Sequence, residues 1–378
     1  MRWSLFLRYK IDLRKQIYYF VDMLDIQKTL TTHPKALPPS DKLGFGQYFT
    51  DHMFVAKFSE DKGWYSSQIL PYGPLPIDPG ASVFHYGQAL FEGMKAFRQD
   101  SGSVVLFRPE FNYHRLKEGA ERMCLEAPPL DLFMKGLQAL IQADERWIPN
   151  APNTALYIRP TLIGTEAFLG VRPSRETTFF VILSPVGSYY AEGARPVKIW
   201  AEETYLRAAP GGLGAVKAGA NYAASLKAAM EARKKGYAQV LWLDVEHKGI
   251  EEVGTMNVFF VFKNEIVTPA LNGSILAGGT RDAIIQLLKK KGHPLVERKI
   301  TIQEVIEKIQ SGDLLEAFGT GTAAVISPIG ELHYKNKDWA VNNHQVGTLS
   351  AELYKEICEI QRGTQTDALK WITPLSQL

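Results

Sequence analysis

The stretch GGLGAVKAGANY, residues 211–222, places a single lysine, Lys217, among glycine and alanine between two structured segments. Glycine lets the backbone or a ligand approach closely. Flanked by Ala215, Val216 and Ala218, the Lys217 amine is expected to be poorly solvated. Desolvation lowers an amine pKa and favours the neutral form that makes a Schiff base with an aldehyde. The alternatives are a loop lysine pointing to water and a nucleotide-binding P-loop, which would need Gly before the lysine and Ser or Thr after it.

On either side of this stretch the hydrophobic pattern switches between strand-like runs and helix-like periods. The part before it predicts an antiparallel sheet, with strands at 104–107, 155–163, 177–183 and 197–201 and helices at 109–125 and 130–147. The part after it predicts a second α/β layer, with helices at 222–235 and 280–291, a capping box at Thr301 and Glu304, and strands at 238–243, 258–262, 314–318 and 323–326. The sequence therefore predicts a two-domain chain of the α+β or α/β class.

The segment SPVGSYYAEGARP, residues 184–196, is the best linker candidate because of its Gly, Pro and Ser content. We expect a small N-terminal domain over residues 23–188, an interdomain linker over 189–202 and a large C-terminal domain over 203–378. Residues 1–22 lack the apolar core and cleavage site of a secretory signal. They are interpreted either as a start-site extension or as a loosely docked helix.

Composition and charge exclude several classes of function. The 43 basic and 40 acidic residues leave a charge of +3, too small and dispersed for a nucleic-acid footprint. The two cysteines, Cys124 and Cys358, form no CxxC motif, so a reducing, cytoplasmic location is expected. No HExxH or G-x-S-x-G motif supports metal or serine-nucleophile chemistry. No apolar stretch approaches the ~18 residues of a membrane span.

Three further motifs could bind an anion or a charged ring, and each has a simpler alternative. The motif EEVGTMNVFFVF (251–262) carries two carboxylates, which are ordinarily solvated. If one of them is buried, it needs a cationic partner, for example the protonated nitrogen of a pyridine ring. The motif GGTRDAIIQLL (278–288) begins a helix. The free amides of its first turn could bind a phosphate, or the Gly-Thr pair could be an ordinary helix N-terminus. FGTGTAAV (318–325) lacks the following helix of a dinucleotide unit and is interpreted as a Gly-Thr turn with free amides.

Two arginines complete the inventory: Arg108 follows a predicted strand, and Arg159 lies inside one. Each either covers a solvated face or points to a site where an anion compensates its charge. A lysine, a carboxylate, an arginine and glycine-threonine turns together suit pyridoxal phosphate, which needs an amine for its aldehyde, an acid for its ring nitrogen and donors for its phosphate.

Seven segments resemble one known family in order along the chain. They are FHYGQALFEGMKAFR (84–98), LFRP (106–109), YIRPTLIGTE (157–166), SPVGSYY (184–190), KAGANYAASL (217–226), EEVGTMN (251–257) and GTGTAAVISP (319–328). They are similar to the branched-chain amino acid aminotransferases, which are fold-type-IV pyridoxal-phosphate enzymes. The likeness runs from about Phe45 to Leu332. It implies an active site between a smaller N-terminal α/β domain and a larger C-terminal domain with a mixed sheet.

The resemblance implies a role for each matching residue. Lys217 would form the Schiff base and act as the catalytic residue, with Glu252 on the pyridine nitrogen and Tyr222 on the ring hydroxyl. The phosphate would be held by Arg108, the amides of Gly279 and Thr280, and Thr322. Tyr157 and the amides of Thr322 and Ala323 would bind the α-carboxylate of the substrate, and Arg159 would bind a side-chain carboxylate. Phe45, Phe91 and Tyr189 would line the apolar pocket. Tyr86 and Val171 would reach the substrate from the other subunit of a homodimer.

The activity implied is ping-pong transfer of the amino group of L-leucine, L-isoleucine or L-valine to 2-oxoglutarate, giving L-glutamate. D-amino acid transaminase and aminodeoxychorismate lyase share the lysine and glutamate and are the closest alternatives. A non-catalytic pyridoxal-phosphate or anion-binding protein is a more distant one.

The sequence departs from the family pattern at two places. Ala277 and Gly279 replace a usual Pro and a branched aliphatic residue, which predicts a more flexible phosphate loop. Ala324 and Ser327 replace the redox CxxC pair of mammalian members, which predicts a bacterial-type enzyme without a thiol switch.

Overall fold

The computed structural model describes residues 25–187 and 195–378, so the proposed extension 1–22 and Tyr189 lie outside the described residues. The helices are α2 (Ser82–Tyr86), α3 (Pro109–Arg122), α4 (Leu130–Ala143), α5 (Gly219–Lys234), α6 (Gly279–Lys290), α7 (Ile302–Gln310) and α8 (Thr348–Arg362), with short 3-10 turns η1 (Glu145–Trp147), η2 (Asn342–His344) and η3 (Leu375–Gln377).

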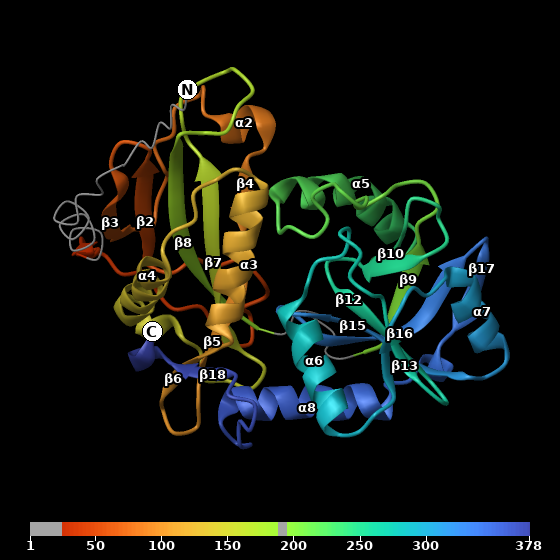
Figure 1. Cartoon of the computed structure of the whole chain (residues 1–378). Helices are drawn as coiled ribbons and strands as arrows, with labels where there is room; N and C mark the ends of the chain where they lie inside the picture. Colours follow the sequence, from red (N-terminus) through yellow and green to blue (C-terminus); the bar gives the residue numbers. More distant parts are fainter. Residues whose placement is uncertain (1–24, 188–194) are drawn as a thin grey trace, which may run out of the picture.

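Two mixed sheets organise the described chain (Figure 1). The strands of the first are β1 (Gln27–Lys28), β2 (His52–Ser59), β3 (Gly63–Pro71), β4 (Ala89–Phe91), β5 (Met94–Arg98), β6 (Val104–Phe107), β7 (Ala155–Gly164), β8 (Glu176–Val186) and β18 (Ile372–Pro374). The strands of the second are β9 (Val197–Ala201), β10 (Gln239–Leu243), β11 (Ile250–Val253), β12 (Asn257–Phe262), β13 (Ile266–Thr268), β14 (Leu295–Glu297), β15 (Leu314–Gly321), β16 (Val325–Tyr334) and β17 (Lys337–Ala340).

The first sheet has the order β1-β3-β2-β8-β7-β5-β6-β18, with β4 paired to β7. All its pairs are antiparallel except β1 with β3, which confirms the antiparallel sheet predicted from the strands at 104–107, 155–163 and 177–183. The prediction is wrong for 197–201, which is β9 of the second sheet and pairs in parallel with β10 and β16. The long β7–β8 pair runs from Ala155 opposite Val186 to Gly164 opposite Thr177. Its inward side chains pack with α3 and α4 in a core that includes Leu116, Phe133 and Phe179.

The second sheet has the order β11-β10-β9-β16-β15-β12-β13-β14, with β17 on β16. Strand β9 pairs in parallel with β10 and with β16, and β13 pairs in parallel with β14, while the other pairs are antiparallel, so this sheet is mixed. Thr301 is the N-cap of α7, and its hydroxyl accepts a hydrogen bond from the Glu304 N–H at 3.1 Å, which confirms one half of the predicted capping box. The Glu304 carboxylate binds Arg298 instead of completing the box.

The two halves are joined by more than the linker. Strand β9, which falls within the expected linker 189–202, lies inside the second sheet between β10 and β16. At the other end of the chain, β18 returns to the first sheet and pairs with β6. Helix α8 lies along the lower edge of the molecule and contacts β5 and β6 as well as β15 and β16 (Figure 1).

One predicted helix is shorter than expected. The pattern predicts a continuous helix over 130–147, but α4 ends at Ala143 and a separate 3-10 turn follows. The reason is Asp144, which is fully buried and whose carboxylate accepts hydrogen bonds from the backbone N–H and the ring Nδ1 of His52, at 3.0 and 2.7 Å. Among the described residues, no helix is long and apolar enough to cross a membrane.

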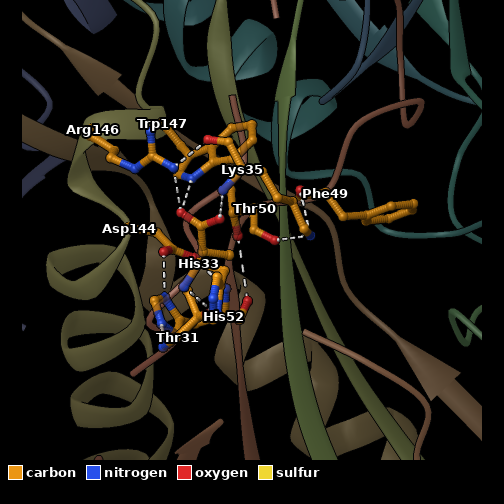
Figure 2. Close-up of polar contacts among 10 residues, drawn as sticks. Thr31, His33, Lys35, Phe49, Thr50, His52, Asp144, Arg146 and Trp147 are labelled. Atoms are coloured by element: carbon orange, nitrogen blue, oxygen red, sulfur yellow. Dashed lines mark hydrogen bonds and ion pairs between the residues drawn. The ribbon is translucent and has the colours of Figure 1, made fainter. Parts of the chain in front are cut away.

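Figure 2 shows a polar cluster that fastens the N-terminal segment to the first sheet; we call it the clasp. It consists of Lys35, Asp51, His52, Asp144, Arg146 and Trp147. The Thr31 N–H donates to His52 Nε2 at 2.9 Å, so the ring proton lies on Nδ1 and is donated to Asp144. The clasp thereby fixes both ends of a segment that carries Phe45 towards the domain interface.

Asp51 is the acceptor at the centre of the clasp. Its carboxylate receives the Lys35 N–H at 2.8 Å, Arg146 Nη2 at 2.7 Å and Trp147 Nε1 at 2.8 Å. Burial by itself would raise the Asp51 pKa, but these three donors outweigh it and hold the pKa below the ordinary 3.8. The charged form therefore stabilises the fold above pH 3.8, and this contribution is lost as pH falls through the lowered value.

We predict that Asp51→Asn lowers the free energy of unfolding at pH 7 by about 2–3 kcal/mol, because buried donors lose a charged acceptor. Denaturant unfolding at several pH values measures this, and the difference from wild type should shrink below about pH 4. Glu60→Gln is the control, since the Glu60–Arg175 pair is exposed and should contribute little. An unchanged difference between pH 7 and pH 3 would contradict the assignment.

Candidate functional site

Lys217 lies where the two halves of the chain meet. Its neighbours Val216 and Ala218 are buried in the core of the first sheet. The backbone carbonyl of Lys217 accepts the Phe91 N–H at 3.1 Å, and Leu90 forms an isolated bridge with Ala218. Because both neighbours face the core, the Lys217 side chain projects from the opposite side of the backbone, into the interface.

The Lys217 amine is enclosed by aromatic rings and a hydroxyl. Nζ donates to the Tyr222 hydroxyl at 2.7 Å and lies 4.8 Å from the Phe91 ring centroid. Burial lowers the Lys217 pKa to about 8; Arg115 adds to the effect, while Glu92 opposes it. The predicted poorly hydrated amine is thus confirmed, and the alternative of a lysine pointing into water is excluded.

Tyr222 is in the first turn of α5. Burial, helped by the nearby charge of Glu252, raises its pKa to about 12. The hydroxyl therefore keeps its proton at neutral pH while it accepts the hydrogen bond from Lys217. A phenol in this position can also donate to an oxyanion placed beside the lysine.

Glu252 is the carboxylate of β11 that faces Tyr222. It is buried, its Oε1 accepts the Leu276 N–H at 2.8 Å, and Arg207 lies 3.4 Å away. Burial raises the Glu252 pKa, while Arg207 and the Leu276 N–H act in the opposite direction. Its neighbour Glu251 is also buried, but contacts Asn272 and Ser274 instead. The solvated alternative for this motif is therefore wrong for both carboxylates.

Arg108, Gly279, Thr280 and Thr322 line one cavity, although they come from the junction between β6 and α3, from α6 and from the turn after β15. Arg108 caps α3 in the left-handed region, with φ 53°. Its Nη1 donates to the Gly279 carbonyl at 2.9 Å, and its other nitrogen pairs with Asp282. The first N–H groups of α6 have no partner within the helix, so the cavity combines a guanidinium, two hydroxyls and helix amides.

The turn from Thr322 to Ala324 connects β15 to β16 and matches the predicted Gly-Thr turn. Val325, directly after it, has φ 61°, a strained conformation for a β-branched residue. Lys95 Nζ donates to the Ala323 carbonyl at 2.8 Å, and burial lowers the Lys95 pKa to about 8. Lys95 and Ala323 both line a cavity of about 420 Å³ between β5, α8 and this turn.

The predicted substrate residues Tyr157, Arg159, Phe45 and Phe91 lie together at the edge of the site. Phe45 packs edge-on against Tyr157 at 4.9 Å, and Arg159 Nη2 donates to the Tyr157 hydroxyl at 3.0 Å. The Arg159 guanidinium lies 4.5 Å from the Phe91 centroid. Gly93 makes this arrangement possible, because any Cβ there would clash with the Tyr157 hydroxyl.

Tyr86 and Val171 are on the surface, 43% and 85% exposed. The Tyr86 hydroxyl donates to the Leu169 carbonyl, so α2 and the β7–β8 loop form one patch. A side chain that contacts the active site of another subunit must be exposed in the single chain, as these two are. The remaining predicted substrate residue, Tyr189, is outside the described part of the chain.

The donor set fits pyridoxal phosphate. Its aldehyde requires a lysine with a lowered pKa, and its ring hydroxyl requires a protonated phenol. Its ring nitrogen requires a buried carboxylate, and its phosphate requires a cavity with arginine, threonine and helix amides. Over residues 25–187 and 195–378, no group of three or more His, Cys, Asp or Glu side chains is arranged to hold a metal ion.

Comparison with known proteins identifies the family. The family model for amino-transferase class IV matches residues 89–332. Branched-chain-amino-acid aminotransferase 2 of Bacillus subtilis is 51% identical over 354 residues, which cover 93% of this chain and 98% of that protein. This chain belongs to the class IV aminotransferases. The resemblance of its motifs to the branched-chain members is thereby confirmed.

Solved structures agree with the fold of this aminotransferase. The branched-chain amino acid aminotransferase of Escherichia coli is 25% identical, with a TM-score of 0.71 over 86% of this chain and 99% of that one. The enzyme of Thermobaculum terrenum, solved in its PLP form, has a TM-score of 0.67 at 23% identity over 85% and 98% of the two chains. The fold-type-IV architecture predicted from the sequence is therefore confirmed.

Three charged residues of this aminotransferase site were missed in the sequence. Arg207 pairs with Glu252, and Glu92 forms a buried ion pair with Arg115. Glu92 gave a signal that could have been used: a lone carboxylate directly after an apolar triplet, in a segment already matched to the family. Arg115 and Arg207 gave none, because an arginine on a helix or in a loop is ordinarily solvated.

We predict that the Lys217 amine of the cofactor-free protein reacts with a limiting acylating reagent with a midpoint near pH 8. Mass spectrometry of digests labelled across pH 6.5–10.5 gives the rate at each lysine. In the same protein unfolded in denaturant, the midpoint for Lys217 should rise to about 10.4, the value of a solvated lysine. Equal midpoints in the folded and unfolded protein would contradict the burial of this amine.

Proposed function

We propose that this chain is a pyridoxal-phosphate-dependent transaminase that moves the amino group of L-leucine, L-isoleucine or L-valine to 2-oxoglutarate. The observation that supports this most strongly is the Lys217 amine, which has a pKa near 8 and lies against a protonated tyrosine. Its relatives support the substrate class, since Bacillus subtilis proteins 51% and 50% identical to it are named branched-chain aminotransferases.

The cofactor, when bound, would supply an aldehyde that exchanges nitrogen with the substrate and a ring that accepts an electron pair. The other steps belong to this chain. Released as a neutral amine, Lys217 can remove the substrate Cα proton and return it, because a pKa near 8 makes the neutral form far more accessible at neutral pH than it is in a solvated lysine. Glu252, already short of water, would hold a proton on the ring nitrogen.

The substrate would be oriented by its charged ends. Tyr157 and the backbone amides of Thr322 and Ala323 would bind the α-carboxylate, while Phe45 and Phe91 would surround an aliphatic side chain. One pocket must also accept the second carboxylate of glutamate. Arg159 suits that task, because its guanidinium lies against the Phe91 ring and the Tyr157 hydroxyl. These contacts limit the cost of leaving it without an anion when leucine is bound.

We also propose that the enzyme is a cytoplasmic homodimer in which Tyr86 and Val171 complete the partner's pocket. Large apolar side chains cluster on this face of the first domain: Phe84, Phe168, Leu169 and Val171 are 43–85% exposed. An apolar patch of this kind on a folded chain favours burial against another protein surface. The proposed domain division, 23–188 and 203–378, follows the two sheets except at β9, which lies in the linker and joins the second sheet, and at β18, which returns to the first.

We predict that adding L-leucine shifts the visible absorbance of the pyridoxal-phosphate-loaded enzyme and that adding D-alanine does not. In Arg159→Leu the half-reaction with 2-oxoglutarate should slow roughly 10- to 100-fold, because a buried carboxylate loses its cation. The leucine half-reaction should change far less. Stopped-flow absorbance measures both.

Arg175→Leu, which changes an exposed arginine, is the control and should leave both rates unchanged. Equal losses in the two half-reactions of Arg159→Leu would contradict the role given to Arg159. A response to D-alanine only would assign the chain to the D-amino acid transaminases.

A further inference from the structure

Glu92 and Arg115 form a buried ion pair that has no place in the proton chemistry described above. Arg115 binds the carboxylate with two nitrogens, Nε to Oε1 at 2.7 Å and Nη2 to Oε2 at 2.8 Å. Asn112 Nδ2 adds a third donor at 2.7 Å. Glu92 has no exposed surface. Because desolvation offsets much of the attraction in such a pair, its geometry is a better guide to its role than its stability.

On one side the pair is attached to the lysine segment. Glu92 directly follows β4, the strand whose last residue, Phe91, donates its N–H to the Lys217 carbonyl. The Glu92 N–H itself donates to the Pro160 carbonyl at 2.8 Å, which anchors it to β7. One backbone hydrogen bond therefore joins the segment that carries Glu92 to Lys217, and a second joins it to β7.

On the other side the pair holds the turn before α6. The remaining terminal nitrogen of Arg115, Nη1, donates to the Ala277 carbonyl at 2.8 Å. Two residues further on, the Gly279 carbonyl accepts Arg108 Nη1 at 2.9 Å. Two guanidinium groups thus bind the carbonyls on either side of Gly278, in a turn whose own side chains are too small to fix it.

The composition of the turn makes this external support necessary. Ala277 and Gly279 stand where the resembled family has Pro and a branched aliphatic residue, which would restrict the backbone themselves. Gly278 cannot be enlarged, because a Cβ there would clash with Asn257 Oδ1. The amides of this turn therefore depend on contacts made by its carbonyls.

We infer that Glu92 and Arg115 are positioning residues that hold the turn 277–279 in register with Lys217, so that an anionic phosphate on the turn and an aldehyde at the lysine can be bound together. This rests on the proposed function. Arg115 is already engaged by Glu92 and Ala277, so it acts through the turn and not as a phosphate ligand of its own.

The test compares two probes on cofactor-free protein: pyridoxal 5′-phosphate, which uses the turn and the lysine, and pyridoxal, which lacks the phosphate. In Arg115→Lys the dissociation constant for pyridoxal 5′-phosphate should rise roughly 10- to 100-fold, because an ammonium cannot bind Glu92 and Ala277 together. The constant for pyridoxal should change far less. Absorbance titration gives both.

Glu92→Gln is the second variant, since its amide keeps the shape of the carboxylate, and it should show the same selective loss. Arg298→Lys is the matched control: Arg298 binds Glu265 and Glu304 away from the site, so both constants should stay at their wild-type values. An unchanged ratio of the two constants in Arg115→Lys and Glu92→Gln would overturn the inference. Wild-type protein that binds neither probe would instead contradict the proposed function.

Discussion

The Lys217 amine is kept from water by segments that belong to different halves of the chain, and the rest of the site depends on this. Strand β4 of the first sheet binds the lysine backbone, and Val216 and Ala218 are anchored in the core of that sheet. Tyr222, which accepts the hydrogen bond from the amine, is in the first turn of α5, which packs on β10 of the second sheet. Neither half alone encloses the amine, so its low pKa exists only when the two sheets are docked.

Charges around the lysine are arranged in pairs. Arg115 with Glu92, Arg207 with Glu252 and Arg108 with Asp282 each combine a guanidinium with a carboxylate. Pairing allows several charges to be placed in one poorly solvated region without a large net field on the amine. For an anionic phosphate, the cavity still offers the Arg108 guanidinium, the hydroxyls of Thr280 and Thr322 and the first amides of α6.

The sequence predicted the residues whose role depends on chemistry and local spacing. Lys217, Tyr222, Glu252 and Arg108 lie in segments that resemble the family, and Thr280 opens the helix predicted at 280–291. The structure brings them to one interface. Sequence reasoning failed where a role depends on a partner far along the chain. Arg115 is 23 positions from Glu92, and only folding reveals that they meet. The same limit explains the helix end at Asp144, set by His52, and the return of β18 to the first sheet.

The location of the covalent link between chain and cofactor tests the account most directly. The pyridoxal-phosphate-loaded protein should be reduced with borohydride, digested and searched by mass spectrometry for a phosphopyridoxyl lysine. We expect a single modified residue, Lys217. Lys95 is the informative competitor, because burial lowers its pKa to about 8 as well. Modification at Lys95 in place of Lys217, or no stable modification at all, would contradict the account.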